Sequence, residues 1–134
     1  MSLKTVEWKD NSVIMIDQTK LPTILEYVTY NDYNQVADAI RTLFVRGAPA
    51  IGVSGAFGLA LASLQSNAIE KNELISYMEN AKKILFETRP TAVNLAWGLE
   101  KIMQAANQGT TVDEIRKNVV DHAKKWQRKT FKSI

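Results

Sequence analysis

Two arginines stand close before prolines, in stretches that could bind an anion. Arg46 precedes the proline of VRGAPAIG at residues 45–52, and Arg89 precedes the proline of TRPTAVN at residues 88–94. Proline suits the first positions of a helix, because its φ is fixed and its missing N–H would have no partner there. A helix start presents unpaired backbone N–H groups and the positive end of the helix dipole. Two arginines in this setting therefore predict a clamp for one phosphate group.

The same residues also have structural interpretations. Each arginine could instead pair with a carboxylate such as Glu87 or extend into solvent. Thr88 and Thr91 flank Arg89 as candidate hydroxyl donors or helix caps. Asn94 lies in the expected first turn of the following helix, where its side chain could reach a ligand or simply pack against a neighbouring loop.

Glycines recur every three residues in the segment that follows the first arginine motif. Gly52, Gly55 and Gly58 each cost about 1 kcal/mol relative to alanine inside a helix, so close packing must repay them. We expect Gly55 and Gly58 to face another helix, and we expect Gly47 to bring backbone N–H groups close to a ligand. The spacing is not a dinucleotide-binding fingerprint, because that motif directly follows a strand and a helix is expected here.

The remaining reactive side chains show no catalytic pattern. Cysteine is absent, which excludes a disulfide, a zinc–thiolate site and a thiol nucleophile within these 134 residues. His122 is the single histidine, and the carboxylates lack a paired spacing suited to acid–base catalysis. We therefore predict no catalytic residue, no metal site and no cofactor in this chain. The tryptophans are expected in the core or at an interface: Trp8, Trp97 and Trp126.

The elements expected to position these residues form one α+β domain. β-branched and aromatic residues predict strands at 6–8, 13–16 and 24–30, with turns at 10–12 and 20–22. Helical periodicity then predicts a helix capped by Asn31 or Asp32 that ends near 46–47, and further helices at 49–66, 70–86 and 91–108. A fifth helix should begin after Thr110 or Thr111. The fold class is thus a small N-terminal antiparallel sheet of about three strands followed by a bundle of about five helices.

Composition narrows the class of protein. The net charge is +3, and much of the basic excess lies near the C-terminal end without a nucleic-acid reader motif, so no nucleic-acid partner is expected. From 48 to 64 only Ser54 and Ser63 are polar, yet this run is short for a membrane span and lacks flanking anchors. We expect a buried helix there, no membrane association, and a cytoplasmic protein without a signal peptide.

The two arginine motifs carry a family resemblance. Together with VEW at 6–8 and the LP at 21–22, RGAPAIG at 46–52 and TRPTAVNL at 88–95 resemble the N-terminal part of methylthioribose-1-phosphate isomerase and related sugar-phosphate isomerases. These enzymes share ancestry with regulatory subunits of translation initiation factor 2B. The resemblance covers most of the chain to about Met103.

The resemblance implies a two-domain isomerase that interconverts an aldose 1-phosphate and a ketose 1-phosphate in methionine salvage. It implies substrate binding by Arg46, Gly47, Ala48 and Arg89. The catalytic cysteine and aspartate of the family belong to a Rossmann-like C-terminal domain, which 134 residues are too few to contain. We therefore expect residues 1–134 to be the single, substrate-gripping N-terminal domain of a larger enzyme that forms a homodimer. Alone, it should be inactive.

Two alternatives remain open at this point. The chain could be a non-catalytic assembly module of the initiation factor 2B type, in which the arginines are relics or sense a sugar phosphate or nucleotide. It could also be a free-standing helical binding protein.

Overall fold

The computed structural model describes residues 6–16, 23, 26–42 and 48–131. Its N-terminal part is an antiparallel sheet of β1 (Val6–Lys9), β2 (Ser12–Ile16) and β3 (Tyr27–Tyr30) in the order β1-β2-β3. Val6 is opposite Met15, which in turn is opposite Val28. The expected sheet is confirmed, although its third strand begins at Tyr27, and residues 24–25 of the predicted strand lie outside the described residues.

A tight turn joins β1 to β2. Asp10 and Asn11 have φ values of 52° and 58°, in the left-handed region that short polar side chains tolerate. Such angles at both central residues match the right-handed twist of the flanking strands, which favours a two-residue hairpin. The predicted turn is therefore confirmed, while the predicted break at 20–22 lies outside the described residues.

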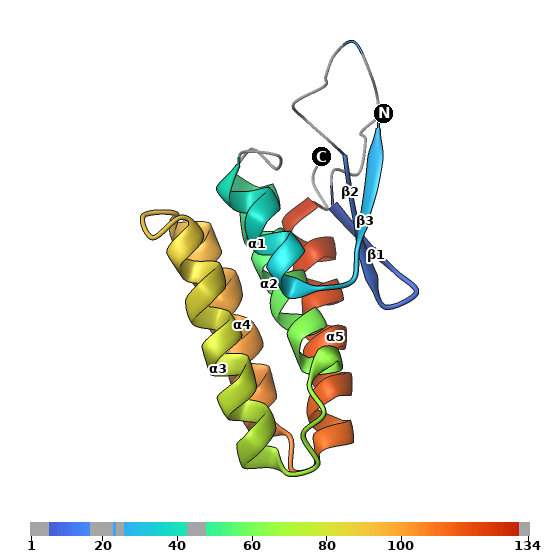
Figure 1. Ribbon diagram of the computed structural model, residues 1–134, viewed down its shortest axis with the longest axis vertical. Coiled ribbons are helices and arrows are strands. Elements are labelled where there is room, and N and C mark those ends of the chain that lie inside the picture. Colours follow the sequence, from blue (N-terminus) through green and yellow to red (C-terminus); the bar gives the residue numbers. More distant parts are fainter. Residues whose placement is uncertain (1–5, 17–22, 24–25, 43–47, 132–134) are drawn as a thin grey trace.

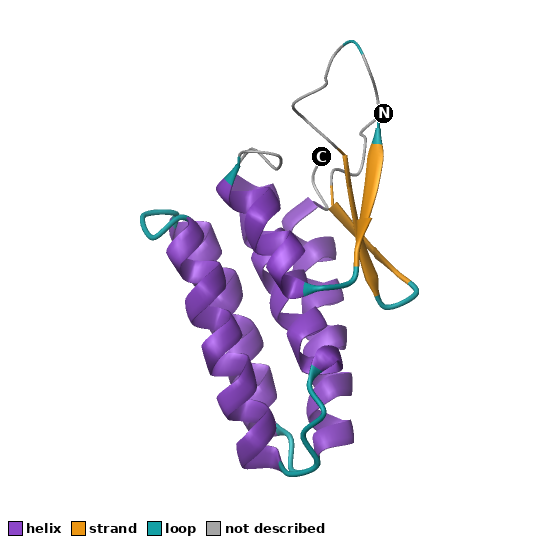
Figure 2. Ribbon diagram, viewed as in Figure 1, coloured by secondary structure: helices purple, strands orange, loops and turns teal. Residues whose placement is uncertain are grey.

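The described helices confirm a mostly helical domain. They are α1 (Tyr33–Arg41), α2 (Ala48–Gln65), α3 (Lys71–Thr88), α4 (Val93–Gln108) and α5 (Val112–Phe131). The sheet lies on one side of the bundle, towards the end where α5 terminates (Figures 1 and 2). A hydrogen bond from the side chain of Gln127 in α5 to the Val6 carbonyl, at 2.7 Å, links the two parts.

α2 is the central helix of the bundle and contacts each of the other four. It is apolar on every side, as expected for a helix surrounded by protein. Its buried hydroxyls, Ser54 and Ser63, donate to helix carbonyls of Ala50 and Ala60, both at 2.7 Å. The buried helix predicted from the apolar run is confirmed. Nowhere in the described residues does a helix combine the length and apolar character needed to cross a membrane.

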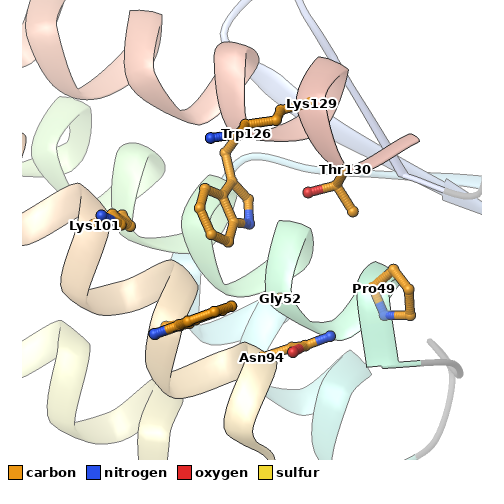
Figure 3. Close-up of a pocket in the computed structure, with 8 residues that line it drawn as sticks. Pro49, Gly52, Asn94, Lys101, Trp126, Lys129 and Thr130 are labelled. Atoms are coloured by element: carbon orange, nitrogen blue, oxygen red, sulfur yellow. The ribbon is translucent and has the colours of Figure 1, made fainter. Parts of the chain in front are cut away.

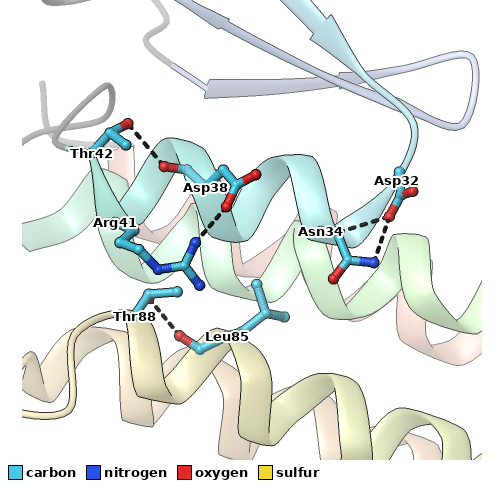
Figure 4. Close-up of polar contacts among 7 residues, drawn as sticks. All are labelled: Asp32, Asn34, Asp38, Arg41, Thr42, Leu85 and Thr88. Atoms are coloured by element: carbon cyan, nitrogen blue, oxygen red, sulfur yellow. Dashed lines mark hydrogen bonds and ion pairs between the residues drawn. The ribbon is translucent and has the colours of Figure 1, made fainter.

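α1 is shorter than the sequence predicts. Asp32 caps it by accepting from the Asn34 N–H at 2.8 Å, as proposed (Figure 4). The helix ends at Arg41, where the Thr42 N–H donates to the Asp38 carbonyl, and so it does not reach residues 46–47. The apolar pattern had extended the prediction through Leu43 and Phe44, which lie outside the described residues. An ion pair between Arg41 and Asp38 closes the last turn.

Glycines of α2, together with Gly98 of α4, allow very close helix packing. A Cβ on Gly52 would lie 2.8 Å from the Asn94 carbonyl oxygen, and one on Gly98 would lie 2.5 Å from the Gly52 carbonyl oxygen. Gly55 meets Leu95, and Gly58 meets Val36 and Leu85. The packing roles predicted for Gly55 and Gly58 are confirmed. The close approach of Gly52 to Asn94 and Gly98 holds the first turns of α2 and α4 beside each other.

Candidate functional site

The loop between α3 and α4 and the first turns of α2 and α4 form a pocket of about 560 Å³. Its walls are Ile51 of α2 and residues 88–94. Arg89 is the one charged side chain among these lining residues. The pocket thus combines a guanidinium with two nearby helix starts, which is an arrangement suited to an anion.

The Arg89 side chain is partly fixed by the fold. Its Nε–H donates to the Ile40 carbonyl at the end of α1, at 3.1 Å, and the side chain is partly buried. Within the described residues it forms no ion pair with Glu87 or any other carboxylate. The two terminal nitrogens therefore keep donors for a further acceptor, while the Nε bond orients the planar group.

The helix start predicted after Arg89 is displaced. Pro90 does not open α4; Arg89 is the C-terminal cap of α3, and Pro90 lies in a turn closed by the Ala92 N–H and the Arg89 carbonyl at 3.0 Å. α4 begins at Val93, and no side chain caps it at Ala92. Proline fits a turn as well as a first helical position, and the sequence alone does not distinguish them.

The polar residues that flank Arg89 are Thr88, Thr91 and Asn94, and they differ in their surroundings. The Thr88 hydroxyl donates to the Leu85 carbonyl at 2.6 Å, so its hydrogen is engaged within α3 (Figure 4). Thr91 is exposed and does not cap α4. Asn94 lines the pocket, while its backbone packs against Gly52.

The other half of the predicted clamp is only partly described. Arg46 and Gly47 lie outside the described residues, so their convergence with Arg89 stays a prediction. Ala48 begins α2, and Pro49 is the second residue of that helix. Ile51, in the same first turn, lines the pocket together with Arg89, which brings the start of α2 to the α3–α4 loop.

A second depression, which we call the α4–α5 groove, adjoins the Arg89 pocket, because Asn94 lines both. Its volume is about 510 Å³. Trp126 projects from α5 towards α4 within it, and Lys101 and Lys129 border it (Figure 3). The residues that line it are Pro49, Gly52, Asn94, Trp97, Lys101, Trp126, Lys129 and Thr130.

The tryptophans occupy three different environments. Trp8 packs its ring against Phe57 with a centroid distance of 5.5 Å. Trp126 is partly buried against the core, but Trp97 is 61% exposed and Val93, one turn earlier, is 72% exposed. Trp97 therefore does not belong to the core of this domain.

The side chains of two basic residues of α5, Arg116 and His122, contact backbone carbonyls. The Arg116 guanidinium donates to the carbonyls of Ser63 and Ser66 at 2.8 and 2.7 Å, where α2 ends. Sequence reasoning missed this role, because nothing local to Arg116 reveals a partner about fifty residues away. His122 is exposed, with its Nδ1 2.8 Å from the Asn118 carbonyl oxygen.

Comparison with known proteins places the chain in a family. The model of the initiation factor 2 subunit family matches residues 44–134, which include both arginine motifs. The chain belongs to the initiation factor 2 subunit family. Within the family it is 47% identical over 118 residues to the methylthioribose-1-phosphate isomerase of Geobacter metallireducens, and this match covers 87% of the chain but 34% of the relative.

Solved structures agree with this assignment. One is titled translation initiation factor eIF-2B, subunit delta, from A. fulgidus, with a TM-score of 0.88 and 41% identity over 93% of this chain and 36% of that one. Another is 5-methylthioribose 1-phosphate isomerase from Pyrococcus horikoshii, with a TM-score of 0.86 and 43% identity over 91% of this chain and 35% of that one. The chain is homologous to the N-terminal portion of such isomerases and spans about a third of their length.

Proposed function

We propose that this chain is the N-terminal, substrate-binding domain of an aldose–ketose isomerase that converts methylthioribose 1-phosphate to methylthioribulose 1-phosphate. The observation that carries the proposal is the position of Arg89, in a pocket between two helix starts, within a chain 47% identical to an isomerase. In this proposal Arg89, Arg46 and the backbone of Gly47 and Ala48 bind the phosphate.

The pocket's side chains suit binding and not proton transfer. Isomerisation moves hydrogen between adjacent carbons, which requires a positioned acid and base or a protected hydride path. The described residues that line the pocket include neither a carboxylate nor a histidine, and arginine keeps its proton at neutral pH. The reacting groups would therefore come from the part of the enzyme that the longer relatives carry.

A chimera tests this proposal. Residues 1–134 would replace the corresponding N-terminal portion of the Geobacter metallireducens isomerase, and the product would be assayed with methylthioribose 1-phosphate. We expect the chimera to be active and the 134-residue chain alone to be inactive. The positive control is the parent isomerase. The negative control is a chimera in which an unrelated helical domain replaces the N-terminal portion.

A regulatory role is the second candidate. The TM-score of 0.88 to a structure titled eIF-2B subunit delta favours it, because the same helices in such a protein need not bind substrate. A folded chimera without isomerase activity would support this non-catalytic assembly module and contradict the enzymatic proposal.

A further inference from the structure

The exposed apolar residues at the start of α4 form one patch with the α4–α5 groove. Val93 and Trp97 are one helical turn apart, and both project from the domain with exposed fractions of 72% and 61%. Trp97 also lines the groove opposite Trp126 of α5. Single exposed apolar residues are ordinary, but a contiguous group that includes an exposed tryptophan marks an interaction surface.

The border of this patch is basic. Lys101 and Lys129 line the groove, and Lys125 lines the adjoining depression along α5. Neither depression has an acidic lining residue in the described part of the chain. An apolar centre with a positive rim is complementary to an apolar surface with a negative rim.

A second copy of this chain fits the surface poorly. A two-fold contact would bring the same patch to both sides, and neither copy has an acidic residue in the described lining to pair with the lysines of the other. Like charges brought together in this way oppose association.

The rest of a longer protein fits it better. α5 ends at Phe131, immediately after two residues that line the groove, Lys129 and Thr130. In a protein as long as the relatives, of which this chain covers 34%, the following polypeptide would leave the domain beside the groove.

We propose that the α4–α5 groove, with Val93 and Trp97, is the docking surface for the C-terminal portion of the longer protein, which presents an apolar group with an acidic rim. This inference rests on the proposed two-domain enzyme, and it assigns a surface that adjoins the Arg89 pocket, since Val93 also lines that pocket. Docking would also hold the C-terminal portion beside Asn94, which lines both depressions.

Hydroxyl-radical footprinting with mass spectrometry tests the docking. The oxidation rate of Trp97 is compared between the 134-residue chain and the chimera described above, without substrate. We expect about a tenfold slower oxidation in the chimera, because a docked tryptophan becomes fully desolvated. Ile69 is the internal control: it is 85% exposed, in the loop between α2 and α3 at the opposite end of the bundle, and its rate should not change (Figure 1).

A charge reversal completes the test. Lys101→Glu with Lys129→Glu should restore rapid oxidation of Trp97 in the chimera, whereas Lys117→Glu, near the start of α5, should not. A chimera that leaves Trp97 fully reactive, or that fails to fold while the 134-residue chain folds, would overturn the proposal.

Three further outcomes are distinguishable. Protection of Trp97 in the 134-residue chain, with a dimer in sedimentation, would assign the surface to a second copy instead. Protection of Trp97 from oxidation by a single-stranded oligonucleotide would assign the surface to nucleic acid, since stacking on an aromatic beside lysines is also a nucleic-acid feature. Protection in a folded but inactive chimera would support docking while contradicting the isomerase proposal.

Discussion

Among the described residues, the Arg89 guanidinium has one hydrogen bond, through Nε, and this bond could hold a flexible side chain in place to bind an anion. The Nε bond to the Ile40 carbonyl fixes the side chain, and the terminal nitrogens remain beside the pocket. A lysine at this position would keep the charge and lose the fixed planar geometry. The arginine and proline spacing predicts an anion-binding role for Arg89, which stays a prediction, and it could not reveal the bond to α1, which joins residues 49 positions apart.

Arg116 shows that an arginine in a basic stretch can be structural. Its guanidinium donates to two carbonyls at the end of α2, a helix terminus that otherwise leaves such acceptors without intrahelical partners. We expect Arg116→Met to lower the free energy of unfolding by about 1.5–3 kcal/mol, the range for hydrogen bonds from charged groups.

Urea denaturation of the 134-residue chain measures this change. Arg128→Met is the matched control, because Arg128 is exposed on the same helix and should leave the midpoint almost unchanged. Equal stability of the two variants would contradict the capping role of Arg116.

At the scale of elements, the helix pattern was largely predictable and the helix ends were not. The apolar run located α2, helical patterning located α3 and α4, and the predicted threonine cap located α5, where Thr111 accepts from the Glu114 N–H at 3.1 Å. The predicted end of α1 and the predicted start of α4 were wrong. Both predictions followed residues that suit a helix, Leu43 and Phe44 after α1 and Pro90 before α4, whereas Thr42 and Arg89 are the C-terminal caps of α1 and α3.

The crossing of α2 and α4 depends on the absence of two side chains. Gly98→Ala would favour the helix by up to about 1 kcal/mol through propensity alone. Its Cβ would, however, lie 2.5 Å from the Gly52 carbonyl oxygen, and backbone cannot yield as a flexible side chain can. We expect a net loss of about 1–3 kcal/mol from overpacking.

Thermal and urea unfolding of the 134-residue chain would test this substitution. Gln104→Ala, at an exposed position of the same helix, should change the stability by less than about 0.5 kcal/mol. A more stable Gly98→Ala variant would mean that the two helices do not approach as closely as described.

The domain as a whole has a well-buried core, but one group of apolar side chains on its surface is exposed to solvent. α2 is surrounded by protein, whereas Val93 and Trp97 remain exposed beside the Arg89 pocket. The sequence predicted the fold class and identified the tryptophans as core or interface residues, but periodicity could not separate the two. Trp97 is exposed and lines the α4–α5 groove, and only the assembled bundle makes this visible.

We propose that Arg89 binds the phosphate of the substrate, and the kcat/KM of the active chimera measures the contribution of this contact. Arg89→Gln should lower kcat/KM by about ten- to a hundredfold, as expected for the loss of a charge-assisted contact. Lys117→Gln, which removes one positive charge at the opposite end of the bundle, should leave it unchanged. An Arg89→Gln chimera with the kcat/KM of the unsubstituted protein would show that Arg89 does not bind the phosphate.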